Sequence, residues 1–165
     1  MTPSWEQTWM TVAYVVAQRS RCVRAKVGAV VVDSRQRVVS TGYNNPPVGM
    51  RTEGECAGWC PRAQASLLCP GYSDCLSVHA EANAIAYADR ARMDAGTLYV
   101  TRAVCIQCAK LVANCGLYRV VMCLTERDNH LDPTSTARFL ESSGLVVEYG
   151  VAASQCVVPS LSWKD

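Results

Sequence analysis

The sequence predicts an α/β domain of three layers, in which helices cover both faces of a mixed β-sheet. Two apolar, β-branched runs at residues 27–32 and 38–43 are separated by a polar stretch, which is typical of an antiparallel hairpin. Strand and helix patterns then alternate between residues 79 and 149, which is typical of parallel strands joined by crossover helices. The chain has 165 residues, so we expect residues 1–165 to form one domain.

The remaining elements follow from apolar spacing and from helix-capping residues. Trp5 and Trp9 begin an apolar pattern at helical spacing, which predicts an amphipathic helix over residues 5–19. Asp132 before Pro133 suits the N-cap and the first position of a helix. The further predictions are a helix over 79–93, a strand over 97–101, a helix over 105–115, a strand over 118–124, a helix from Asp132 through Leu140 that Gly144 ends, and a strand over 145–149.

Residues 44–77 show neither helical nor strand periodicity and are rich in glycine, proline, cysteine and polar residues. A structureless loop of this length is uncommon in a compact domain unless something braces it. A structural zinc ion could tie this insertion, about residues 45–78, to the end of the first helix, whereas the alternative is a set of reduced, inert thiols. The cysteines in or near the loop are Cys22, Cys56, Cys60, Cys69 and Cys75.

The composition limits the possible partners. Half of the residues are hydrophobic and 18% are charged, as in a packed soluble domain and unlike a disordered chain. The net charge of +2 is too small to favour a nucleic-acid partner. Arg24 and Lys26 belong to a basic bunch with Arg19 and Arg21, which is either a local anion site or a solvated stretch beside a helix end.

The cysteine count bears on the cellular compartment. No secretory signal is visible, and no uncharged apolar run approaches the ~20 residues that span a bilayer. We therefore expect a cytoplasmic protein with no membrane partner. Because disulfides rarely persist in a reducing cytosol, 10 cysteines point to metal ligation or buried thiols.

Three residues carry the strongest chemical signal. His79 precedes Ala80 and Glu81, and Cys105 and Cys108 form a Cys-x-x-Cys pair. One histidine and two cysteines supply soft tetrahedral ligands for zinc and leave a fourth position open, as in a catalytic zinc site. Both segments are expected to begin helices, whose positive ends favour thiolates.

Glu81 is the predicted proton shuttle. It lies two residues after the histidine and need not bind the metal, so its carboxylate is able to take a proton from water and pass protons to the ring nitrogen and the leaving amine. His-x-Glu followed by Cys-x-x-Cys is the pattern of zinc deaminases of nucleobases. The alternative is a closed structural zinc site with Glu81 at the surface.

The chain resembles the deoxycytidylate deaminase branch of the cytidine deaminase-like superfamily over roughly residues 5–150. The resemblance rests on the segments at 26–30, 42–44, 79–85 and 98–101 and on the cysteine-rich stretch before His79. It implies an α/β/α cytidine deaminase-like fold with five strands, one catalytic Zn²⁺, and hydrolysis of dCMP to dUMP and ammonia. It also implies a homo-oligomer, commonly a hexamer, and Mg²⁺ with nucleotide effectors.

By the same resemblance, Asn44 would bind the sugar hydroxyl and the backbone near Ala103 would receive the exocyclic amine. A second zinc would be held by Cys22, Cys56 and Cys75, with Cys60 favoured over Cys69 as the fourth ligand. Two positions depart from the family pattern, since Val104 replaces a proline and Asn45 replaces a glycine.

The substrate phosphate needs a cationic partner, for which Arg24 and Lys26 are the candidates. The alternatives to dCMP are CMP, a 5-modified cytosine nucleotide and a free nucleoside, and the alternative to an enzyme is a zinc-stabilised binding module. The retained Glu81 argues against that module, because a structural zinc does not need the carboxylate.

Overall fold

The computed structural model describes residues 2–64, 75–125, 128, 132–152 and 156. These residues contain a five-stranded sheet in the order β2-β1-β3-β4-β5, as predicted. The strands are β1 (Gly28–Val32), β2 (Val38–Tyr43), β3 (Thr97–Val100), β4 (Arg119–Met122) and β5 (Val146–Tyr149). No helix in these ranges is long and apolar enough to cross a membrane.

The sheet is mixed, and its two halves follow the two sequence patterns. β1 pairs antiparallel with β2 through the predicted hairpin, and β1 also pairs antiparallel with β3. β3 pairs parallel with β4, and β4 with β5, because a helix returns the chain between each pair. In the hairpin turn, Asp33 Oδ1 accepts hydrogen bonds from the backbone nitrogens of Arg35 and Arg37, and Gln36 takes a positive φ of 61°.

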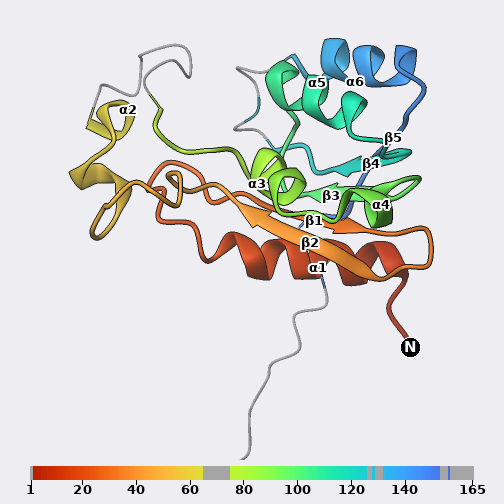
Figure 1. The fold of residues 1–165 in the computed structure, drawn as a ribbon, viewed down its shortest axis with the longest axis horizontal. Helices are drawn as coiled ribbons and strands as arrows, with labels where there is room; N and C mark the ends of the chain where they lie inside the picture. The colour runs from red at the N-terminus through yellow and green to blue at the C-terminus, as the bar shows by residue number, and fades with distance from the viewer. Residues whose placement is uncertain (1, 65–74, 126–127, 129–131, 153–155, 157–165) are drawn as a thin grey trace, which may run out of the picture.

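Helices cover both faces of this sheet, so the predicted three layers are confirmed (Figure 1). Helix α1 (Trp5–Ala17) lies on one face, where Met10 and Ala13 pack with Val30, Tyr99 and Val121. Helices α3 (Ala80–Ala86), α5 (Ile106–Asn114) and α6 (Pro133–Ser142) lie on the other face, and α3 packs directly on β1 and β2.

One predicted element is wrong. The single helix expected over residues 79–93 is two helices, α3 and the short α4 (Arg90–Met93). The break lies between them because Asp89 leaves the helical conformation, and its side chain accepts hydrogen bonds from the backbone nitrogens of Ala91 and Arg92. Asp89 is thus the N-cap of a new helix instead of an interior residue of a long one.

Side-chain caps begin α1 and α6, and those of α6 were predicted from the sequence. Ser4 and Gln7 form a reciprocal capping box at the start of α1. Asp132 accepts a hydrogen bond from the backbone nitrogen of Ser135, with Pro133 at the first position of α6. Beyond its C-terminus, Gly144 has a φ of 88°, a conformation that suits glycine.

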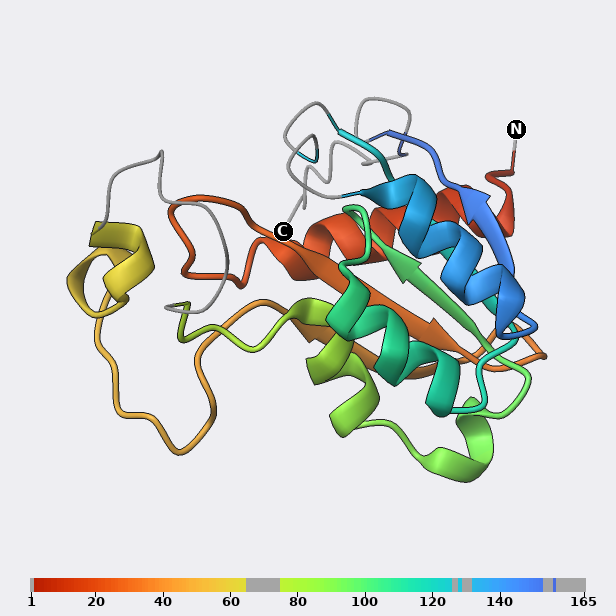
Figure 2. The same ribbon diagram turned by 90° about the horizontal axis from the view of Figure 1, so that it is seen from above.

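The cysteine-rich insertion lies at one end of the sheet (Figure 2). Its described part holds a 3₁₀ turn, η1 (Cys56–Gly58), and the short helix α2 (Pro61–Gln64). Arg21 holds the loop to the end of α1, because its guanidinium donates to the carbonyl and the hydroxyl of Thr52. Cys69 lies outside the described residues.

Candidate active site

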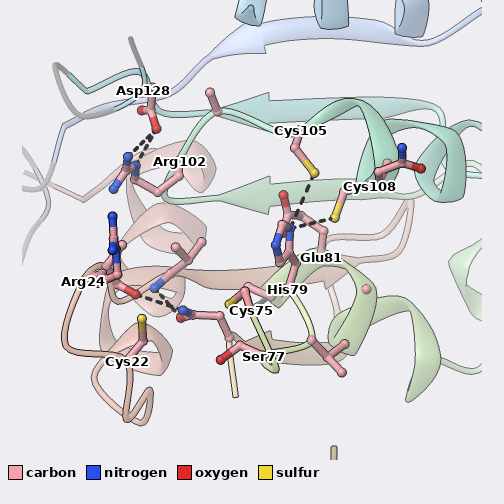
Figure 3. Close-up of a pocket in the computed structure, with 18 of the residues that line it drawn as sticks. Cys22, Arg24, Cys75, Ser77, His79, Glu81, Arg102, Cys105, Cys108 and Asp128 are labelled. Atoms are coloured by element: carbon pink, nitrogen blue, oxygen red, sulfur yellow. Dashed lines mark hydrogen bonds and ion pairs between the residues drawn. The ribbon is translucent and has the colours of Figure 1, made fainter. Parts of the chain in front are cut away.

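Two helix starts bring the candidate metal ligands together. His79 is the N-cap of α3 and Cys105 is the N-cap of α5, and neither side chain caps its own helix. His79 Nδ1 lies 3.5 Å from Cys105 Sγ and 3.4 Å from Cys108 Sγ (Figure 3). Their ligand atoms all lie within 4.8 Å of one another, which no other group of three or more such side chains achieves in the described part of the chain.

This geometry fits a zinc ion. With Zn–S bonds of about 2.3 Å and Zn–N bonds of about 2.0 Å, tetrahedral angles separate sulfur from nitrogen by about 3.5 Å. The observed separations of 3.4 and 3.5 Å therefore match a tetrahedral zinc centre. Three protein ligands leave a fourth position for a reactant, which is the arrangement of catalytic zinc sites.

Hydrogen bonds within the triad shift the pKa of each of its three side chains. A hydrogen bond with Cys108 and another with His79 lower the pKa of Cys105 to about 4, against the opposing effect of burial. The same hydrogen bond with Cys105, together with burial, raises the pKa of Cys108. The pKa of His79 is raised, chiefly by its hydrogen bond with Cys105. A thiolate is thus already favoured at Cys105, and thiolates are the form that binds metal.

Glu81 lies in the first turn of α3, beside this triad. Its side chain is buried, with only 4% of the residue exposed. Burial raises the pKa of the carboxyl, and the positive charge of the nearby His79 imidazole opposes that shift. A carboxyl whose pKa moves towards neutrality exchanges protons more readily at physiological pH.

The triad and Glu81 line one pocket together with several residues singled out from the sequence. Ala103 is buried in its wall, and Arg24 lines it while donating from Nη1 to the carbonyl of Arg62 at 3.1 Å. Lys26 is exposed and does not line this pocket, so its role in substrate binding stays a prediction.

Asn44 also lines the pocket, but most of its side chain holds the backbone of the preceding segment. Its Oδ1 accepts from the nitrogen of Val27 at 2.8 Å, and its Nδ2 donates to the carbonyl of Ala25 at 2.9 Å. An amide nitrogen carries two hydrogens, so one donor of Asn44 remains for a ligand. These contacts fix the orientation of that donor.

Sequence reasoning missed two residues in the pocket wall, Arg102 and Asp128. They form an ion pair at 2.5 Å although 26 residues separate them in the chain. One signal was present, because Arg102 stands between a predicted strand and the first cysteine of Cys-x-x-Cys. No local pattern marked Asp128.

The four candidate ligands of a second zinc, Cys22, Cys56, Cys60 and Cys75, line the same pocket. Burial, together with the neighbouring thiols of Cys22 and Cys60, raises the pKa of Cys56 to about 11. Burial also raises the pKa of Cys75, with contributions from Cys60 and Cys22. Within the described residues, no three of these sulfurs lie within 4.8 Å of one another.

Known proteins match this chain over most of its length. The family model for the cytidine and deoxycytidylate deaminase zinc-binding region matches residues 3–124. A deoxycytidylate deaminase of Mycobacterium phage D29 is 46% identical over 126 residues, which cover 72% of this chain and 94% of that protein. A deoxycytidylate deaminase of Enterobacteria phage T2 is 31% identical over 189 residues, which cover 96% of this chain and 94% of that protein.

The fold is likewise similar to a solved structure. The crystal structure of the dCMP deaminase from the cyanophage S-TIM5 in complex with dCMP and dUMP has a TM-score of 0.68 and 27% sequence identity. The match covers 90% of this chain and 98% of the phage enzyme.

Proposed function

Because the chain belongs to the cytidine and deoxycytidylate deaminase zinc-binding family, we propose that it is a hydrolase that converts dCMP and water to dUMP and ammonia. The observation that carries this proposal is the buried carboxyl of Glu81 beside the triad of His79, Cys105 and Cys108 in the wall of one pocket. The dCMP and dUMP bound to the similar phage enzyme support the choice of substrate.

His79, Cys105 and Cys108 would hold the catalytic zinc, since their chemistry and spacing suit a tetrahedral ion. When bound, zinc supplies Lewis acidity, which makes water a nucleophile near neutral pH. The chain itself contributes a rigid frame, because two of the ligands are N-caps of helices that pack on the sheet.

Glu81 would carry the protons. It takes one from water as the oxygen bonds to the ring carbon that bears the amine, and it delivers this proton to the adjacent ring nitrogen. It then transfers the second proton of the water to the amine, and the carbon–nitrogen bond breaks to release ammonia. The low exposure of Glu81 keeps bulk water from competing for these transfers.

The pocket wall would position the nucleotide. The backbone at Ala103 would receive the exocyclic amine, and the remaining amide hydrogen of Asn44 would bind the sugar; the support is that both residues line the pocket of the triad. Arg24 supplies positive charge in the same wall. A non-catalytic binding module would have no use for a buried carboxyl beside its metal.

The test of this function is a kinetic comparison of dCMP with deoxycytidine. We expect kcat/KM for dCMP to be at least ~100-fold higher, about 2.7 kcal/mol of transition-state binding, because only the nucleotide offers a phosphate to the pocket cations. CMP and 5-substituted dCMP in the same assay decide the sugar and ring preferences. Equal values for dCMP and deoxycytidine would contradict the nucleotide assignment and favour a nucleoside deaminase.

We also propose a second zinc ion in the cysteine-rich insertion, held by Cys22, Cys56, Cys60 and Cys75. The support is that the four thiols line one pocket and that Cys22 and Cys60 contribute to the raised pKa of Cys56 and of Cys75. Their sulfurs would move together on binding, and the metal would then brace the long insertion.

Metal content tests this second site. Elemental analysis of the purified protein should give about two zinc ions per chain, and Cys75→Ser should lose one of them and lower the Tm. The matched control is Cys115→Ser, a buried thiol away from both sites, which should keep the full zinc content. A single zinc in the intact protein would refute the second site.

The remaining proposals rest on the chain length, on the apolar pattern of the sequence and on the family resemblance. They are a single domain over residues 1–165, a homo-oligomer that is commonly a hexamer, Mg²⁺ with nucleotide effectors, and a cytoplasmic location.

A further inference from the structure

Arg102 and Asp128 form a nearly buried ion pair in the pocket wall. Arg102 Nε and Nη2 lie 2.6 Å and 2.5 Å from Asp128 Oδ1, and the two side chains are 15% and 3% exposed. Arg102 follows β3 and Asp128 follows β4, and these strands are parallel neighbours. Their carboxyl ends therefore meet at one edge of the sheet, where ligands of open α/β sheets bind.

Asp128 fixes the guanidinium without using all of its donors. Asp128 Oδ2 accepts from the backbone nitrogen and the hydroxyl of Thr125, at 2.8 and 2.9 Å, so the carboxylate itself is held in place. Arginine carries five N–H donors, and Asp128 engages only Nε and Nη2.

The remaining nitrogen, Arg102 Nη1, has no hydrogen-bond partner among the described residues. Among the described residues, Trp59 Nε1 is the only fully buried side-chain nitrogen or oxygen that lacks a hydrogen-bond partner. Because Arg102 Nη1 also lacks a partner, it is not one of the fully buried atoms and is therefore accessible. An oriented guanidinium with accessible donors in a pocket wall is prepared to bind an anion.

The placement of this guanidinium matches one end of a nucleotide. Figure 3 shows Arg102 and Arg24 on one side of the pocket, with Cys105 and Cys108 on the other. A nucleotide whose base lies at the metal ligands directs its phosphate away from them. The guanidinium groups of Arg24 and Arg102 therefore lie at the end of the pocket away from the metal ligands.

We propose that Arg102, held in position by Asp128, binds the 5′-phosphate and makes this site selective for nucleotides over nucleosides, an inference that rests on the proposed deamination of dCMP. The planar guanidinium offers a phosphate two parallel hydrogen bonds, which a lysine ammonium does not. Arg24 is the second cation, and its Nη1 donates to the carbonyl of Arg62.

The experiment compares Arg102→Gln with the matched control Arg92→Gln, which removes an arginine from a more exposed ion pair with Asp33. For Arg102→Gln we expect kcat/KM for dCMP to fall about 30-fold or more, mainly through KM, while the value for deoxycytidine falls far less. Affinity for the product should change in parallel, with dUMP binding weakened and deoxyuridine binding kept. Arg92→Gln should preserve the ratio of kcat/KM for dCMP to kcat/KM for deoxycytidine.

A second pair of variants covers the case in which Arg102→Gln does not fold. Arg102→Lys keeps the positive charge but loses the two parallel hydrogen-bond donors of the guanidinium. Asp128→Asn keeps the guanidinium but weakens the ion pair that orients it. Both variants should therefore lower the ratio of kcat/KM for dCMP to kcat/KM for deoxycytidine about fivefold or more. A preserved ratio, or equal losses on both substrates, would overturn the role of Arg102.

The outcome for the wild-type protein separates this inference from the proposed function. Wild-type selectivity for dCMP that survives every Arg102 variant refutes the inference alone. A wild-type protein that deaminates neither compound refutes the function, and binding of dUMP against deoxyuridine then decides the phosphate contact. Equal wild-type affinity for dUMP and deoxyuridine would refute the phosphate site itself.

Discussion

Glu81→Gln is expected to lower kcat by about three to four orders of magnitude while the protein keeps its fold and its catalytic zinc. The glutamine side chain has the same shape as the buried carboxyl, so packing against α3 and the pocket wall is maintained. It accepts no proton at physiological pH, however, and every proton transfer of the proposed reaction passes through this position. Affinity for dUMP should change little, because Glu81 acts on protons rather than on the phosphate or the sugar.

The measurement is steady-state kinetics on dCMP with zinc content and Tm determined on the same preparations. Glu141→Gln is the matched control, since Glu141 is an exposed carboxyl on α6 and its loss should leave kcat unchanged. Turnover of Glu81→Gln within about tenfold of wild type would remove the proton-shuttle role. Loss of zinc in this variant would make Glu81 a metal-site residue instead.

Most of the sheet could be predicted because its strands carry local signals. β1 is a run of apolar, β-branched residues, and β2 follows it after a polar turn, so the hairpin is visible in the sequence. The N-terminal half of α6 was equally visible through Asp132 and Pro133. These features depend on neighbours in the chain, which is why single-sequence reasoning found them.

The one wrong element lies where local and tertiary signals disagree. The helical apolar spacing continues across residues 87–89, so one helix was predicted, but the side chain of Asp89 caps a new one. The assignment of Asn44 to the sugar rests on a resemblance and stays a prediction, and the structure adds backbone partners for its side chain at Ala25 and Val27. The side chain of Asn44 therefore shapes the pocket wall as well as lining it.

The ion pair of Arg102 and Asp128 was missed for a different reason. Arg102 lies just beyond β3 and Asp128 lies in the segment after β4, and the parallel pairing of β3 with β4 brings the two together. Spacing along the chain contains no trace of this contact. The metal triad spans a similar distance in sequence, but it was found because its two halves form a pattern that is specific to one chemistry.

Gly42 controls how closely the helix that carries His79 and Glu81 approaches the sheet. A Cβ atom at Gly42 would lie 2.2 Å from the carbonyl oxygen of Ala80 and 2.4 Å from the nitrogen of Ala84. Both are backbone atoms of α3, so no side-chain rotation relieves the overlap. The helix is also tied to β2 at this point, because Ser40 Oγ donates to the carbonyl of Ala84 at 2.6 Å.

Gly42→Ala is therefore expected to push α3 away from β2 and to carry His79 and Glu81 with it. We expect a loss of about 2–3 kcal/mol in the free energy of unfolding, because overpacked sites force the backbone to shift. A displacement of about 1 Å at a catalytic group costs on the order of 100-fold in rate, so kcat should fall by a similar factor. Zinc affinity should fall as well, because His79 would move relative to Cys105 and Cys108.

Two further glycines separate local displacement of the site from general instability. Gly58→Ala places its Cβ where nothing lies within 4 Å, so stability, zinc affinity and kcat should all stay near wild type. Gly28→Ala places its Cβ 2.0 Å from the carbonyl oxygen of Ala13 in α1, on the opposite face of the sheet, so it should lose stability but keep the zinc affinity of the folded protein. Urea unfolding, zinc titration with a competing chelator and kinetics on dCMP measure the three properties. If Gly42→Ala matches Gly28→Ala in zinc affinity and kcat, α3 tolerates the shift and Gly42 does not set the geometry of the site.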